Sequence, residues 1–110
     1  MIDSEIELKR SSGNIYTDLG FPDAEQMLIK AQLVSKIGEI LRTRKWTQQH
    51  ASQVLGIPQP KLSKMLRGQF RGISESKMLE CLTKLGRDIQ IVIGNEKASS
   101  AIGSIGVISA

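Results

Sequence analysis

Apolar residues recur at steps of three and four along most of the chain. The first such stretch has six apolar positions on one helical stripe: Met27, Leu28, Ala31, Val34, Ile37 and Leu41. This spacing predicts an amphipathic α-helix. Asp23 stands where it can cap the start of that helix, and Glu25 lies in the first turn, where the helix dipole favours an acid. Gly38 interrupts the stripe and indicates either a break or a close contact with another helix.

Three shorter helical patterns follow the first one. Their apolar positions are, in order, Ala51, Val54 and Leu55; Leu62, Met65 and Leu66; and Met78, Leu79, Leu82 and Leu85. Thr47 and Ser74 are good N-caps for the first and third of these helices. Gly56, Gly68 and Gly86 follow the three patterns, as expected for residues that end helices in the left-handed conformation. The pattern therefore predicts a bundle of at least four helices.

The remaining segments are predicted to be extended or unstructured. Residues 88–93, DIQIVI, place three isoleucines on one face at period two, which predicts a β-strand. Residues 15–19 alternate in the same way and form the candidate second strand. Residues 1–14 are predicted to be a flexible arm and residues 95–110, rich in Gly, Ser and Ala, a disordered tail. The predicted fold is mainly α, with one domain over residues 15–94.

Charge is distributed unevenly along the chain. The formal net charge is +4. Residues 1–35 carry three basic and six acidic side chains, whereas residues 36–71 carry eight basic side chains against Glu39 alone. A block of net charge +7 in the middle third indicates a polyanionic partner, with nucleic acid first among the candidates.

Composition narrows the class of protein and gives no support to catalysis. A chain of 110 residues with 40% hydrophobic and 24% charged residues is typical of one globular domain. No apolar run approaches the ~20 residues needed to cross a bilayer. Cys81 is the one cysteine, which excludes an internal disulfide and favours a reducing cytoplasm. His50 and Cys81 are isolated from other reactive groups, so we predict no enzyme activity, no cofactor and no metal site.

Residues 47–68, TQQHASQVLGIPQPKLSKMLRG, have the pattern of a helix–turn–helix. The inward positions are predicted to be Ala51, Leu55, Ile57, Leu62 and Met65. The outward positions are then Gln59, Lys61, Ser63, Lys64 and Arg67, a set without a carboxylate. Such a helix fits the major groove of B-DNA, where Lys, Gln and Ser read base edges. Pro60 is tolerated because the first turn of a helix has N–H groups without intrahelical partners; Pro58 either shares in the contact or only shapes the turn.

This segment resembles the helix–turn–helix of the XRE class of regulators, the Cro and phage-repressor type. The matching residues are Thr47-Gln48, Gly56-Ile57, Gln59, Leu62-Ser63, Met65 and Arg67-Gly68. Ala51-Ser52 departs from the class, in which a larger aliphatic residue followed by Ala is usual. The flanking sequences NIYTDLGFPDAEQMLIKAQLV and LTKLGRDIQIVI are similar to a subgroup of HigA-like antitoxins, so that the resemblance covers roughly residues 14–94.

The resemblance implies a lambda-repressor-like bundle of four to five helices with the C-terminal strand. It also implies a bacterial, cytoplasmic, nucleoid-associated repressor of its own promoter that neutralises a RelE/HigB-like toxin. Two alternatives stay open: an antitoxin whose main task is to mask the toxin, and a stand-alone or prophage repressor without a toxin. The acidic N-terminal third would suit a basic toxin surface, and a solvated arm is the equal alternative.

Site residues follow from the resemblance position by position. The residues implied to contact bases or their sugars are Gln59, Pro60, Lys61, Ser63 and Lys64. The residues implied to contact phosphates are Thr47, Gln48, Arg67 and Arg71, with Arg44 and Lys45 as weaker candidates. We expect a homodimer on double-stranded operator DNA, with strand 88–93 pairing across the two-fold axis and half-sites about 34 Å apart.

Overall fold

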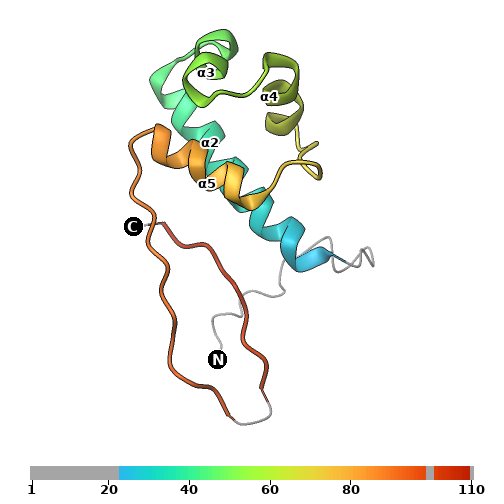
Figure 1. The fold of residues 1–110 in the computed structure, drawn as a ribbon, viewed down its shortest axis with the longest axis vertical. Coiled ribbons are helices and arrows are strands. Elements are labelled where there is room, and N and C mark those ends of the chain that lie inside the picture. Colours follow the sequence, from blue (N-terminus) through green and yellow to red (C-terminus); the bar gives the residue numbers. More distant parts are fainter. Residues whose placement is uncertain (1–22, 99–100, 110) are drawn as a thin grey trace.

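The computed structural model describes residues 23–98 and 101–109. The described residues form four helices: α2 (Ala24–Arg44), α3 (Gln48–Leu55), α4 (Gln59–Leu66) and α5 (Glu75–Lys84). The long helix α2 packs against α5 and α4, and α3 packs against α4 and α5. In Figure 1, α5 lies beside α2, and α3 and α4 lie together at one end of this pair. The predicted mainly helical bundle is confirmed.

Two of the three predicted helix caps form as expected. The Thr47 hydroxyl accepts a hydrogen bond from the His50 backbone N–H at 3.0 Å, and the Ser74 hydroxyl accepts one from the Lys77 N–H at 3.1 Å. Each bond satisfies an N–H group that has no partner inside its helix. Asp23 occupies the N-cap position of α2, but its side chain makes no capping bond and pairs instead with the guanidinium of Arg71. The position of the predicted cap is therefore right, but the predicted capping hydrogen bond is wrong, because the Asp23 carboxylate forms a long-range ion pair instead.

The buried face of α2 is wider than the predicted stripe. Leu28 and Ala31 are only partly buried, whereas Leu33 and Ile40, which the stripe omits, lie in the core. The reason is that α2 packs against two helices, α5 and α4. The helix continues through Gly38, where an added Cβ would lie 3.8 Å from Cδ2 of Leu66 on α4. Gly38 therefore does not break the helix, and it lies buried at an ordinary van der Waals contact between α2 and α4.

One charged side chain lies in this core. Lys30 on α2 is 5% exposed, and its ammonium group donates to the backbone carbonyl of Arg71 at 2.8 Å. A buried cation without a hydrogen bond would strongly destabilise the fold. Lys30 therefore ties α2 to the loop between α4 and α5.

The predicted strand at residues 88–93 is wrong. This segment has no regular secondary structure, and Ile91, Val92 and Ile93 are 84%, 80% and 91% exposed. A strand needs a neighbouring strand to satisfy its backbone groups, and the described part of the chain supplies none. Figure 1 shows the segment leaving the bundle and residues 101–109 returning toward it.

The structure does not test the predictions made for the N-terminal residues and for the C-terminal tail. Residues 1–14 and 15–19, the predicted arm and second strand, lie outside the described residues. The disordered tail stays a prediction, although Val107 is partly buried against the core. No helix within the described ranges is both long and apolar enough to cross a membrane.

Candidate nucleic-acid interface

The turn between α3 and α4 is fixed by backbone geometry and by one hydroxyl. Gly56 has a φ of +69°, in the left-handed region that glycine adopts without strain, and its N–H donates to the Ser52 carbonyl at 2.9 Å. The Ser52 hydroxyl in turn donates to the carbonyl of Ile57. Ser52, where the sequence departs from the XRE pattern, thus ties α3 to the turn. The resemblance to that class did not indicate this role.

The two prolines stand at the start of α4 without harming it. Pro58 is the N-cap residue, with extended backbone, and Pro60 is the second residue of the helix. A proline there loses no intrahelical hydrogen bond, since the first N–H groups of a helix have no partner within it. The explanation given for Pro60 from the sequence is confirmed.

The helix–turn–helix has one buried and one exposed face, as predicted. The predicted inward residues are all buried: Ala51, Leu55, Ile57, Leu62 and Met65. The predicted base-contacting residues are exposed except Ser63, which is partly buried: Gln59, Pro60, Lys61, Ser63 and Lys64. The sequence has no acidic residue between Glu39 and Glu75. The exposed face of α4 therefore offers hydrogen-bonding and cationic groups, with no carboxylate to repel phosphate.

Three of the four predicted phosphate-contacting residues lie together at one groove. The groove has a volume of about 570 Å³, and Thr47, Gln48 and Arg67 line it together with Arg42 and Lys45. The Arg67 guanidinium also donates to the Ser63 hydroxyl at 3.0 Å. Arg42, in the last turn of α2, was not among the predicted site residues. It reaches the site because α2 packs against α4, which in turn packs against α3.

Arg71 and Arg44 have other partners in the structure. Arg71 pairs with Asp23. Arg44 donates to the carbonyl of Leu85 at 2.6 Å, and its guanidinium carbon lies 5.1 Å from the Trp46 ring centroid. Leu85 follows the last residue of α5, so Arg44 ties the end of α2 to the end of α5. Their proposed contacts with phosphate stay predictions.

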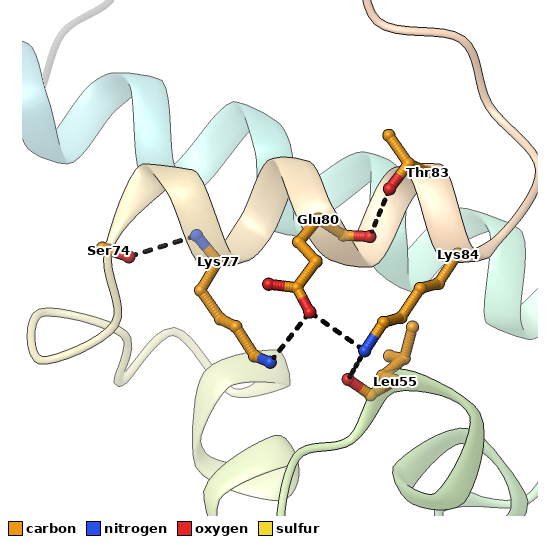
Figure 2. Close-up of polar contacts among 6 residues, drawn as sticks. All are labelled: Leu55, Ser74, Lys77, Glu80, Thr83 and Lys84. Carbon is orange, nitrogen blue, oxygen red and sulfur yellow. Dashed lines mark hydrogen bonds and ion pairs between the residues drawn. The ribbon is translucent and has the colours of Figure 1, made fainter.

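A cation on α5 holds the end of α3. Figure 2 shows Lys84 between Glu80 and Leu55: its Nζ lies 3.0 Å from the Glu80 carboxylate and donates to the Leu55 carbonyl at 3.3 Å. Leu55 is the last residue of α3, where the helix dipole favours a positive charge. Hydrogen bonds from Lys84 and Lys77 lower the pKa of the Glu80 carboxyl, which therefore stays ionised and orients both ammonium groups.

We expect the substitution Lys84→Met to destabilise the domain by about 1 kcal/mol. The change leaves the Leu55 carbonyl without its side-chain donor and removes the charge at the end of α3. Urea denaturation followed by circular dichroism would measure it. Lys77→Met is the matched control, because Lys77 pairs with Glu80 at 3.4 Å on the same helix, whereas the Leu55 carbonyl accepts from Lys84. Equal losses in the two variants would contradict the role given to Lys84.

Cys81 and His50 lie in different surroundings, one in the core and the other on the surface of α3. Cys81 is fully buried, and burial raises the pKa of its thiol, which keeps it protonated. His50 is exposed on α3 and meets the edge of the Trp46 ring, with 4.4 Å between the ring centroids. Among the described residues, no three His, Cys, Asp or Glu side chains gather as a metal site would require.

Two short helices joined through a left-handed glycine, with a cationic outer face, define the class of helix–turn–helix proteins. The chain belongs to this family, because the model of the family described as "Helix-turn-helix domain" matches residues 15–94. It is also similar to the solved structure of a "Putative XRE Family Transcriptional Regulator", with a TM-score of 0.73 and 31% sequence identity over 81% of this chain and 100% of the other. The search of curated proteins found no match. The predicted XRE type is confirmed.

Proposed function

We propose that this chain is a sequence-specific DNA-binding transcriptional regulator that inserts α4 into the major groove. The observation that carries the proposal is the face of α4 that is exposed, cationic and free of acids, held in place by a fully buried opposite face. The base contacts would come from Gln59, Pro60, Lys61, Ser63 and Lys64. Thr47, Gln48 and Arg67, together at the groove, would contact the phosphates that fix the register.

We expect Arg67→Ala to weaken binding evenly across DNA sequences. A lost phosphate contact releases one fewer counterion, so the slope of log K against log salt should fall in magnitude by about 0.9. Fluorescence anisotropy at several salt concentrations would measure it. The matched control is Lys36→Ala on α2, because Lys36 pairs with Glu39 at 3.2 Å away from the helix–turn–helix. An unchanged slope and affinity for Arg67→Ala would remove this residue from the interface.

We further propose that the protein binds DNA as a homodimer joined through residues 88–93. Three isoleucines alternate in this segment, and Ile91 and Ile93 are largely exposed in the single chain. In an antiparallel two-fold contact with Ile91 opposite Ile91 of the second copy, Ile89 lies opposite Ile93. All three isoleucines then share one face. The two α4 helices would reach successive major grooves about 34 Å apart.

Sedimentation at micromolar concentration, with and without DNA, tests the dimer. We expect Ile91→Arg to produce monomers, whereas Ile102→Arg should leave the dimer intact. Ile102 is a matched control because it is 91% exposed and lies outside the proposed contact. A monomeric parent chain under both conditions would contradict the proposal.

The partner proposed from the resemblance to HigA-like antitoxins is a RelE/HigB-like toxin in the bacterial cytoplasm. The net charge of −3 over residues 1–35 suits a basic, RNA-binding toxin surface. Co-expression with the product of the neighbouring gene, followed by pull-down, would test this partner. A footprint of the shared promoter with and without that product would test autoregulation. The alternative is a repressor without a toxin, which is favoured if no toxin gene lies beside this one.

A further inference from the structure

We propose that the groove beside α3 is also the docking site of this chain's own N-terminal segment, residues 2–8. Docking would set up a competition with the DNA backbone. A contact with the DNA backbone would use only the cationic rim of the groove. The apolar floor beneath that rim suits a ligand with apolar groups. The regulatory consequence rests on the proposed DNA-binding function, whereas the docking itself does not.

The floor of the groove is apolar and partly open. Val34 and Leu41 of α2, Leu66 of α4 and Trp46 line it. Val34 and Leu41 are buried, but Leu66 and Trp46 are only partly buried. An indole and a leucine side chain left in contact with water gain free energy when another apolar group covers them.

The rim of the groove carries three cations, Arg42, Lys45 and Arg67. An added Cβ on Gly38 would lie 3.2 Å from Nη1 of Arg42, so this guanidinium reaches across the helix face at the floor. No carboxylate of the described residues forms an ion pair with any of the three. The groove therefore suits a ligand that has both aliphatic and acidic groups.

Residues 2–8 have this composition. The segment reads Ile-Asp-Ser-Glu-Ile-Glu-Leu, with aliphatic residues Ile2, Ile6 and Leu8 and acidic residues Asp3, Glu5 and Glu7. Its charge of −3 matches the +3 of the rim. The segment and the groove are thus complementary in charge, and both have apolar side chains to bring together.

The length of chain between the segment and α2 permits the contact. Residues 9–22 join Leu8 to Asp23, and when extended these residues span about 46 Å. The rise along α2 from Asp23 to Gly38 is about 22 Å. The segment can therefore reach the groove of its own chain at a high effective concentration.

Docking would compete with DNA because Thr47, Gln48 and Arg67 line the same groove. A chain whose groove is occupied nine-tenths of the time would bind DNA about tenfold more weakly than a chain with a free groove. A partner that captures the acidic segment would relieve this inhibition. The segment would then link the binding of a basic partner to the binding of DNA.

The fluorescence of Trp46, the one tryptophan of the chain, reports on the groove directly. Acrylamide quenching of the full chain should increase when Ile2, Ile6 and Leu8 are all replaced by Ser. It should also increase in the triple variant Asp3→Asn, Glu5→Gln, Glu7→Gln. A synthetic peptide of residues 1–14 added to either variant should restore the protection, less so at high salt. Equal quenching of the parent chain and both variants would overturn the proposal, whether or not the protein binds DNA.

DNA affinity separates docking from long-range repulsion between the acids and phosphate. Docking predicts that both triple variants bind DNA about tenfold more tightly than the parent chain. Repulsion alone predicts tighter binding only for the variant that removes the acids, and that result would contradict docking. If no chain binds DNA, the proposed function fails, and the Trp46 measurement still decides the docking.

Discussion

Leu62→Ala is expected to lower the stability of the domain by about 2–5 kcal/mol. Leu62 is completely buried on the inner face of α4, and truncation removes buried apolar atoms and leaves a cavity. Small domains have a total stability of about 5–15 kcal/mol, so a large part of it would be lost. The midpoint of thermal unfolding should fall by roughly 10–30 °C. Circular dichroism on heating and in urea would measure both effects.

Lys61→Ala is the matched control for this prediction. Lys61 precedes Leu62 on α4 but is exposed, so its removal should change stability by no more than about 0.5 kcal/mol. The two variants should separate the functions of the two faces: Leu62→Ala destabilises the domain, and Lys61→Ala weakens DNA binding without a loss of stability. Similar unfolding midpoints for the two would contradict the packing of α4 described above.

Local signals in the sequence were enough to predict most of the helices. Thr47 and Ser74 cap α3 and α5 within three residues of their partners, and Gly56 takes the predicted left-handed conformation. Such bonds depend only on neighbouring residues, which is why sequence patterns reveal them. The inner and outer faces of α4 were predictable for the same reason, because the helical period fixes which residues share a face.

Contacts between distant residues were not predictable in this way. Asp23 pairs with Arg71, and Lys84 reaches Leu55, across separations of 48 and 29 residues. The charge pattern of α5 would show that Lys84 can pair with Glu80, but it does not reveal the carbonyl of another helix. The groove at Trp46 was missed for a related reason, since it exists only where α2, α3 and α4 meet.

The strand at residues 88–93 was predicted wrongly because alternation of apolar and polar residues indicates only a tendency to form a strand. Residues 88–93 have the period of a strand with one apolar face, yet no described segment pairs with them. In the single chain their isoleucines therefore remain exposed. An apolar alternating segment that finds no partner within its own chain is a reason to look for one outside it, and this leads to the proposed dimer contact.

Gln59→Ala is expected to reduce the discrimination between the preferred DNA sequence and unrelated DNA. Gln59 is the first residue of α4 and is exposed at the end of the helix where base contacts concentrate in this motif. A glutamine amide that reads a base edge contributes about 1–3 kcal/mol, so binding to the preferred sequence should weaken by roughly 5- to 150-fold. Binding to unrelated DNA should change little, because phosphate contacts supply it.

Selection from a randomised DNA library with the parent chain would provide the preferred sequence for this measurement. A second selection with the Gln59→Ala variant should return sequences in which one position of each half-site is relaxed. Gln53→Ala is the matched control, since Gln53 is an exposed glutamine on α3 that is not among the proposed contacts. If Gln59→Ala lost affinity equally for preferred and unrelated DNA, Gln59 would belong to the backbone contacts. The reading of bases would then depend on the other exposed residues of α4.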